Sequence, residues 1–198
     1  MLVSYSQPHM PNSTTLEQSI AYCARVSNPA NQNNHETDDR LLKYLIKHHH
    51  WSPFEMVSIC LEINSTRDIC RQIMRNRSFS FQEFSQRYAD TTIVAGDKDP
   101  VDAWEQKQQE ILEMAKNTYN WALNNGIAKE TARTVLPEGM TQSRMYMNGT
   151  LRAWIHYIHL RTGNGTQQEH RDVALNCAKA IATIFPMILE FVVRDEFF

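Results

Sequence analysis

Apolar and other side chains alternate strictly from Val57 to Ile63. One face carries Val57, Ile59, Leu61 and Ile63, and the opposite face carries Ser58, Cys60 and Glu62. A period of two is typical of a β-strand with one buried face. The chain is therefore expected to build at least part of a sheet here, and a purely helical fold is excluded.

The strand pattern changes to a helical one within three residues. Ser65 or Thr66 can cap a short helix, and Asp68 is favourable in its first turn. Arg67, Arg71 and Arg75 recur every four residues, so their side chains are expected to project from one side of this helix.

Apolar residues at helical spacing recur along the rest of the chain. They predict helices over Thr15 to Val26, from Asp38 or Asp39 through Ile46, from Asp99-Pro100 to Asn125-Gly126, from Ile127 to Leu136, from Asn148 or Thr150 through Leu160, and from about Gln167 to Val193. The long middle helix has an expected apolar seam that includes Trp104, Ile111, Ala115 and Ala122, and Pro186 is expected to kink or divide the last helix. The pattern indicates one helix-rich α+β domain over residues 1–198, with its strands in the first half.

The charge balance argues against a polyanionic partner. The 20 Lys and Arg residues against 22 Asp and Glu give a formal net charge of -2, which provides no overall positive field for nucleic acid or an anionic membrane. The sequence has no apolar run of about 18 residues, and residues 1–10 lack the features of a secretion signal. No second cluster of ligand residues accompanies His48, His49 and His50, so no metal site is expected. We expect a cytoplasmic protein without nucleic-acid or membrane partners.

The segment RQIMRNRSFSFQEFSQRY, from Arg71 to Tyr88, concentrates arginines among polar side chains. With Arg67 just before it, these are Arg71, Arg75, Arg77 and Arg87. A planar guanidinium donates paired hydrogen bonds to phosphate oxygens, so a nucleotide or dinucleotide is the ligand class that suits this segment. The rings of Phe79, Phe81, Phe84 and Tyr88 alternate with polar residues through Gln82, and we interpret them as core-packing groups.

The same segment resembles the flavin-dependent thymidylate synthases. That family has Arg-His-Arg, seven residues, then Ser and usually Gly-Arg-Tyr, and here Arg75-Asn76-Arg77 is followed at the same spacing by Ser85-Gln86-Arg87-Tyr88. Further segments resemble the family in the same order. They are Ala24-Arg25-Val26-Ser27, His50-Trp51-Ser52-Pro53-Phe54-Glu55, Leu136-Pro137, Arg144, Arg161 and Gln167-Gln168-Glu169-His170-Arg171. The resemblance is closest to the short viral members, which places the chain in a host cytoplasm if a virus encodes it.

The resemblance implies a homotetramer with a mainly antiparallel small sheet and FAD as cofactor. The activity it implies is the conversion of dUMP to dTMP, with 5,10-methylenetetrahydrofolate as carbon donor and NADPH as reductant of the flavin. On this analogy the FAD-binding residues are Ser27, His50, Ser52, Glu55, Arg75, Asn76, Arg77, Gln82, Glu83, His159, Arg161 and Asn164. The residues implied for dUMP are Gln72, Arg75, Glu83, Phe84, Ser85, Gln86, Arg87, Arg144 and Arg171.

Arg171 and Ser85 are the catalytic residues that the resemblance implies. The matching family arginine lies against the uracil, where a fixed cation stabilises a developing anion without giving up a proton. Ser85 is interpreted as a hydrogen-bonding residue, because the sequence offers no base that would make it a nucleophile. No cysteine is expected beside the nucleotide-binding cluster, so a reduced flavin would supply what a cysteine supplies in the folate-only synthases.

Four departures from the family pattern and two other functions stay open. Asn76 replaces the motif histidine, His159 stands where many relatives have Asn, and Thr166 and His170 replace Ala and Ile. Arginines interleaved with aromatic rings are also found in modules that bind single-stranded nucleic acid. An enzyme of the same fold that makes hydroxymethyl-dUMP fits the same sequence.

Overall fold

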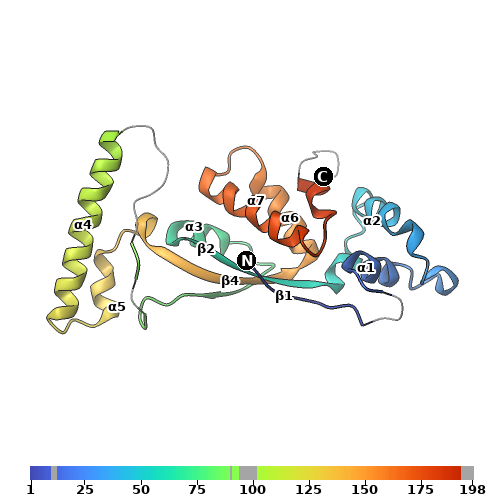
Figure 1. Cartoon of the computed structure of the whole chain (residues 1–198), viewed down its shortest axis with the longest axis horizontal. Coiled ribbons are helices and arrows are strands. Elements are labelled where there is room, and N and C mark those ends of the chain that lie inside the picture. The colour runs from blue at the N-terminus through green and yellow to red at the C-terminus, as the bar shows by residue number, and fades with distance from the viewer. Residues whose placement is uncertain (10–12, 90, 94–101, 193–198) are drawn as a thin grey trace. The chain divides into compact units, whose positions relative to one another are not determined.

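The computed structural model describes residues 1–9, 13–89, 91–93 and 102–192 (Figure 1). The strands are β1 (Leu2–Tyr5), β2 (Ser58–Thr66), β3 (Ser80–Glu83) and β4 (Gln142–Thr150). The α-helices are α1 (Leu16–Ala24), α2 (Asp38–Lys47), α3 (Arg67–Ile73), α4 (Asp102–Asn124), α5 (Lys129–Ala132), α6 (Leu151–Thr162), α7 (Gln168–Ala182) and α8 (Ile188–Val192). Short 3-10 helices are η1 (Pro29–Asn31), η2 (His35–Thr37), η3 (Ser52–Met56), η4 (Arg133–Val135) and η5 (Glu138–Met140).

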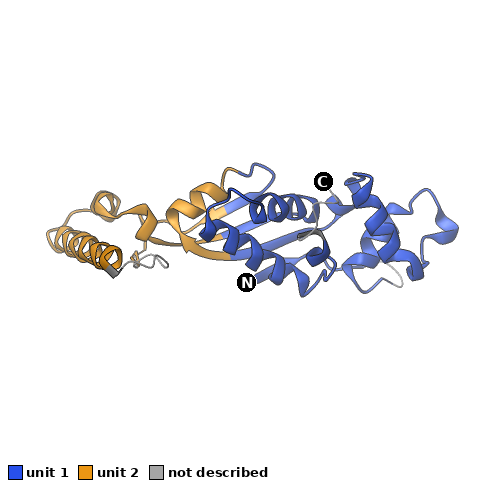
Figure 2. Ribbon diagram, turned by 90° about the horizontal axis from the view of Figure 1, so that it is seen from above, with its two compact units in different colours: residues 1–62, 76–81, 146–198 blue, residues 63–75, 82–145 orange. Residues whose placement is uncertain are grey.

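The chain forms two compact units, which Figure 2 shows in different colours. Unit 1 contains residues 1–62, 76–81 and 146–198, and unit 2 contains residues 63–75 and 82–145. Strands β2 and β4 have residues in both units. No helix of the described ranges combines the length and the apolar character needed to cross a membrane.

The strands form one antiparallel sheet in the order β1-β2-β4-β3. Strand β1 pairs with β2 in the register Leu2 to Leu61 and Tyr5 to Ile59, with an irregularity between Leu2 and Ser4. The predicted apolar face of β2 is buried: Val57, just before the strand, and Ile59, Leu61 and Ile63 are each at most 5% exposed. The α+β class and the strand predicted from alternation are confirmed.

Strand β4 extends the sheet beyond the first half of the chain, where the sequence analysis expected no strand. Ser143, Met145, Met147 and Gly149 are buried, and the residues between them are exposed, so this strand also has a period of two. Its buried face uses Ser, Met and Gly, which are not enriched in strands, and the alternation was therefore missed.

Gly149 of β4 lies where a larger side chain would collide with an aromatic ring. A Cβ atom at this position would approach Cδ1 of Phe79 to 2.4 Å. The Phe79 ring in turn packs edge-on against Trp154 of α6, with ring centroids 4.9 Å apart, and Trp154 donates a hydrogen bond to the backbone oxygen of Ile59 in β2. The glycine therefore allows the core of unit 1 to close around Phe79.

The ends of the first two helices follow from local chemistry. Thr15 and Gln18 form a reciprocal capping box at the start of α1. At the end of α2, His49 has a left-handed backbone with φ of 57°, its N–H donates to Ile46 O, and the N–H of His50 donates to Leu45 O. This pair of bonds is a Schellman motif, which fixes the direction in which the chain enters the segment from His50 to Glu55.

Helix α4 packs through part of the predicted seam. Ala115 and Ala122 are buried as predicted, and Tyr119 and Ala122 pack against Ile127 and Leu136, whereas Trp104 and Ile111 are half exposed. The predicted seam was wrong at Trp104 and Ile111, because the short elements α5 and η4 pack on part of this long helix. The predicted start at Asp99-Pro100 lies outside the described residues.

The C-terminal helices confirm the prediction at Pro186. Helix α7 ends at Ala182 and α8 begins at Ile188, so the expected helix is divided around the proline. Helices α6 and α7 lie side by side (Figure 1), with Trp154, Ile158, Ala174 and Ile181 buried. This pair carries the C-terminal residues of the candidate site.

Candidate functional site

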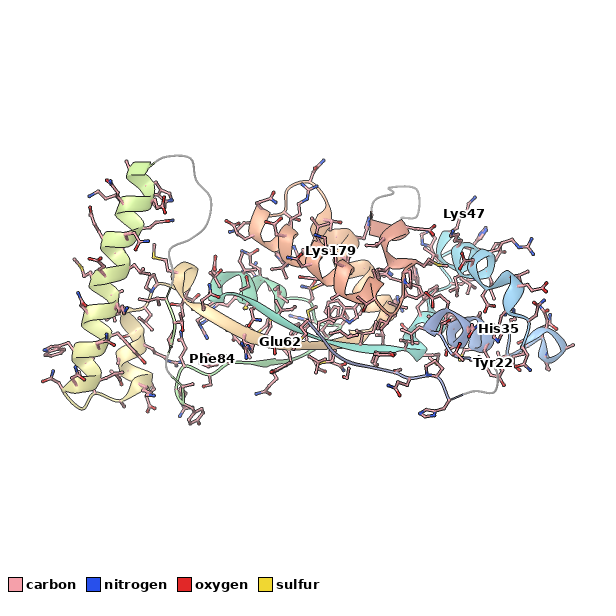
Figure 3. The ribbon with its side chains drawn as sticks, viewed as in Figure 1. Tyr22, His35, Lys47, Glu62, Phe84 and Lys179 are labelled. Atoms are coloured by element: carbon pink, nitrogen blue, oxygen red, sulfur yellow. The ribbon has the colours of Figure 1, made fainter. Side chains whose placement is uncertain are left out.

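The arginine-rich segment runs from the end of α3 through β3 to a tight turn. Arg75, Asn76 and Arg77 connect the two elements, and Gln82 and Glu83 end β3. Phe84, labelled in Figure 3, donates its backbone N–H to the backbone oxygen of Arg144 in β4 at 2.8 Å. The strand β3 thereby fixes the direction of the backbone that leads to Ser85.

The turn that follows presents a hydroxyl and a guanidinium. Ser85 Oγ accepts a hydrogen bond from the backbone N–H of Arg87 at 3.3 Å, which closes a small turn of the Ser/Thr type. The Arg87 guanidinium lies over the Tyr88 ring, 5.5 Å from its centroid. Tyr88 is 77% exposed, so the interpretation of its ring as a core-packing group was wrong, whereas Phe79 is buried as predicted.

Glu83 lies at the centre of a polar cluster in unit 2. Ser143 Oγ of β4 donates to Glu83 Oε1 at 2.8 Å, and Arg67 Nη1 of α3 lies 3.6 Å from the same oxygen. The side chains of Arg67 and Glu83 are only 11% and 16% exposed. Neither Arg67 nor Ser143 was among the predicted site residues.

Cys70 corrects the expectation that no cysteine lies near the nucleotide-binding residues. Its thiol is fully buried on α3 and hydrogen-bonds with Ser143, which also contacts Glu83. Burial, with the nearby Glu83 charge, raises the pKa of this thiol to about 11. A buried thiol that stays protonated at neutral pH is a poor nucleophile, so the cluster does not support attack by cysteine.

The arginines of unit 1 and unit 2 differ in whether a carboxylate pairs with them. Outside the predicted site, Arg25 pairs with Asp38, Arg67 with Glu83, Arg71 with Glu138 and Arg152 with Glu55, whereas Arg40 and Arg133 have no such pair among the described residues. Within the described ranges, the side chains of Arg75, Arg77 and Arg171 have no carboxylate partner. Unpaired guanidinium groups can receive phosphate or another anionic group without first breaking an ion pair.

The first group of predicted flavin residues lies in unit 1 around η3. Ser27 is exposed in the loop after α1, and His50 and Ser52 are exposed at the start of the segment that contains η3. The His50 ring centroid lies 6.4 Å from that of Tyr44 in α2. Glu55 pairs with Arg152 at the start of α6, so its carboxylate already has a cationic neighbour.

The second group lies at the end of α6 and the start of α7, also in unit 1. His159 and Arg161 belong to the last turns of α6, Asn164 is exposed after it, and Arg171 is half-buried in the first turn of α7. Arg161 Nε is buried and, in the part of the chain described, has no hydrogen-bond partner. A buried donor without an acceptor is costly, and a ligand oxygen would satisfy it.

His170 and Tyr157 form a buried pair beside these arginines. Tyr157 Oη and His170 Nε2 lie 3.2 Å apart, and His170 is fully buried. Burial, together with the Arg161 charge, lowers the pKa of His170 to about 4. The imidazole is therefore neutral at pH 7, which could not be predicted from its position in the sequence, where the family pattern has Ile.

This lowered pKa predicts a pH-dependent stability. The unfolded state binds a proton to His170 near pH 6.5 and the folded state only near pH 4, so stability is present above this window and is lost as the pH falls through it. Between pH 7 and pH 5 the loss from this group is about 2 kcal/mol. We expect His170→Ile to show a smaller fall in its urea unfolding free energy over that interval. Equal slopes in parent and variant would contradict the prediction.

The predicted residues are divided between the two units. Gln72, Arg75, Gln82, Glu83, Phe84, Ser85, Gln86, Arg87 and Arg144 belong to unit 2, and Ser27, His50, Ser52, Glu55, Asn76, Arg77, His159, Arg161, Asn164 and Arg171 belong to unit 1. Gln86 is only 6% exposed, which sets it apart from its exposed neighbours Ser85 and Arg87. Arg144 Nε donates to Asn64 Oδ1 of β2 at 2.9 Å.

Sequence comparison finds the same family over nearly the whole chain. The profile of the family described as thymidylate synthase complementing protein, Thy1, matches residues 9–187. A probable flavin-dependent thymidylate synthase of Paramecium bursaria Chlorella virus 1 is 43% identical, over 94% of this chain and 95% of that protein. The flavin-dependent thymidylate synthase of Synechocystis sp. is also 43% identical, over 85% and 86% of the two chains.

Structure comparison gives a consistent result. The crystal structure of the UMP/dUMP methylase PolB from Streptomyces cacaoi, bound with 5-Br dUMP, superposes with a TM-score of 0.77 at 27% identity. The match covers 96% of this chain and 92% of that one. The fold, the match to the Thy1 profile and the two relatives agree with the arginine motif described above, and the chain belongs to the family of flavin-dependent thymidylate synthases.

Proposed function

We propose that this chain converts dUMP to dTMP by reductive methylation, with 5,10-methylenetetrahydrofolate as carbon donor and reduced FAD as hydride source. The observation that carries the proposal is that Arg75, Arg77 and Arg171, which the resemblance assigns to nucleotide and flavin, have no carboxylate partner within the described ranges. Four arginines outside the predicted site, Arg25, Arg67, Arg71 and Arg152, do have one. Family membership supports this assignment.

The residues proposed to bind dUMP offer polar groups that match the phosphate, the sugar and the base. Arg75, Arg87 and Arg144 provide guanidinium groups for the phosphate of dUMP, and Ser85 provides a hydroxyl. Gln72 and Glu83 offer an amide and a carboxylate for hydrogen bonds to the sugar or base, and Phe84 and Gln86 support the turn. Ser85 acts as a hydrogen-bonding group, because the described residues place its Oγ against the Arg87 N–H and no base beside it.

The residues proposed for the flavin fit an anionic cofactor. Arg161 has a buried Nε without a partner in the described part of the chain, which suits an oxygen of the cofactor. Arg75 and Arg77 can bind the phosphates, and His159, Asn164, Ser27, His50, Ser52, Glu55, Asn76 and Gln82 offer further polar contacts. When bound and reduced, FAD supplies the hydride that completes the methyl group.

Arg171 is proposed to act on the pyrimidine. Its guanidinium stays charged at any working pH, so it stabilises negative charge that develops on the uracil when the N3 proton leaves. The neutral, buried His170 beside it does not compete for this proton at pH 7, because its pKa is about 4. Arg171 therefore provides a fixed positive charge where carbon C5 must become electron-rich.

Several wider features are part of the same proposal. The homotetramer, the reduction of flavin by NADPH and the folate donor follow from the family resemblance. One domain over residues 1–198 is supported by a family profile that spans both compact units. These substrates are soluble metabolites, so we place the reaction in the cytoplasm, and in that of the host if the gene is viral.

The first test is the visible absorption spectrum of the purified chain after addition of FAD, followed by anaerobic NADPH with and without dUMP. Bound flavin that bleaches, at a rate that dUMP alters, is the expected result. Product mass after addition of methylenetetrahydrofolate then distinguishes dTMP from hydroxymethyl-dUMP. A chain that binds no flavin but binds oligonucleotides in a salt-sensitive way would overturn the proposal in favour of a nucleic-acid-binding module.

A further inference from the structure

Among the described residues, Glu83 has contacts that fix one carboxylate oxygen, and none is seen for the other. Ser143 Oγ donates to Oε1 at 2.8 Å, and Arg67 Nη1 lies 3.6 Å from the same atom. Both contacts come from elements remote in sequence, since Ser143 lies sixty residues further along the chain. Oε2 is therefore the oxygen to which a ligand can donate.

Arg67 occupies a position that is unfavourable for an arginine. It is the first residue of α3, where the positive end of the helix dipole repels a cation, and its side chain is 11% exposed. Burying a charge is costly unless it is paired. The position of Arg67 therefore indicates that its main effect is on its partner Glu83 and that it does not stabilise the helix.

We propose that Arg67 and Ser143 are positioning residues that hold Oε1 of the Glu83 carboxylate and so aim Oε2 at the nucleotide. The inference rests on the proposed function, in which Glu83 contacts dUMP. Arg67 supplies a fixed positive charge beside Oε1, because its Nη1 lies 3.6 Å from that oxygen and both side chains are largely buried. Ser143 supplies the direction, because a hydrogen bond to Oε1 fixes the rotation of the carboxylate plane.

The other charged and titratable groups around Glu83 do not replace Arg67. On α3 these are Asp68, Cys70 and Arg71, and on β4 the neighbour of Ser143 is Arg144. Arg71 is bound to Glu138 through both Nε and Nη2, at 2.7 and 2.6 Å, and Arg144 Nε donates to Asn64. Cys70 is a protonated thiol at neutral pH, because burial and the Glu83 charge raise its pKa to about 11.

The test is the affinity for dUMP, measured by calorimetry on the flavin-loaded protein at pH 8. In Arg67→Gln the carboxylate loses its cationic neighbour beside Oε1, and the affinity is expected to fall by roughly tenfold. Arg67→Lys keeps the charge and should restore most of the parent's affinity.

Matched variants separate positioning from folding. Arg71→Gln removes an arginine one turn further along the same helix whose partner is Glu138, so the affinity for dUMP should not change. Ser143→Ala is expected to weaken binding, and it provides the test if Arg67→Gln does not fold. In a Glu83→Gln background, adding Arg67→Gln should cause no further loss of affinity, because the group that Arg67 positions has already been changed.

The outcomes distinguish this inference from the proposed function. A parent protein that binds no dUMP at any pH overturns the function. A parent that binds dUMP, with Arg67→Gln at the parent's affinity, overturns the inference alone. If Arg67→Gln cannot be obtained folded, unchanged affinity in Ser143→Ala overturns it as well.

Discussion

Replacing Arg171 by methionine is expected to lower the rate of dTMP formation by about 10²- to 10³-fold, the cost of removing one group that stabilises charge in a transition state. Arg171 lies in the first turn of α7, where the helix dipole disfavours a cation. Its removal should therefore change the free energy of unfolding by less than about 1 kcal/mol. The measurement is single-turnover formation of dTMP in the flavin-loaded protein.

Two variants sharpen the interpretation of Arg171. Arg171→Lys keeps the charge and loses the planar fork, so its rate should lie between parent and methionine variant. Lys179→Met removes an exposed cation from the same helix and should leave the rate unchanged, and Figure 3 shows Lys179 on α7. A methionine variant at position 171 with a rate within about threefold of the parent's would mean that another group stabilises the uracil anion.

Asp38→Asn is expected to destabilise the protein by about 3 to 5 kcal/mol, the usual effect of removing one partner from a buried ion pair. Arg25 Nη1 lies 2.5 Å from Asp38 Oδ1, and the two side chains are 6% and 7% exposed. Arg25 Nη2 donates to Thr37 Oγ1, and His35 Nδ1 lies 2.9 Å from Asp38 Oδ2. The substitution leaves a buried guanidinium without its counter-charge, which urea unfolding at pH 7 would measure.

The same ion pair offers its own controls. Lys43→Met breaks a half-exposed pair between α2 and Glu190 and should cost at most about 1 kcal/mol. Arg25→Met combined with Asp38→Leu removes both charges and should recover much of the stability that the single substitution loses. A loss below about 1 kcal/mol in Asp38→Asn would show that the Arg25 charge is solvated after all.

Local patterns predicted those parts of the fold in which side chains determine the structure. The alternation around Ile59 predicted the buried strand, helical spacing after Thr15 predicted α1, and Pro186 predicted the division of the last helix. Strand β4 was missed because serine, methionine and glycine fill its buried face. The seam of α4 was wrong at Trp104 because burial depends on the length of the neighbouring segment, which helical periodicity does not contain.

In the candidate site, too, local motifs could be predicted and contacts between distant residues could not. The motif around Arg75 and Ser85 could be recognised in the sequence because its residues are consecutive or nearly so. The contacts of Glu83 could not, because Arg67 and Ser143 reach it from separate elements. An arginine is also available to a ligand only when no carboxylate is paired with it. The sequence alone does not show that Arg71 is bound to Glu138.

The close approach of Gly149 to Phe79 ties two distant positions into one shared volume. Any side chain added at residue 149 must take its space from the ring at residue 79, because the Cβ atom and the ring overlap. Phe79 stands two residues after Arg77, so a change of volume in β4 is transmitted to the loop that holds Asn76 and Arg77. We therefore expect residues 79 and 149 to change together in related sequences. A residue larger than glycine at position 149 requires a side chain smaller than phenylalanine at position 79.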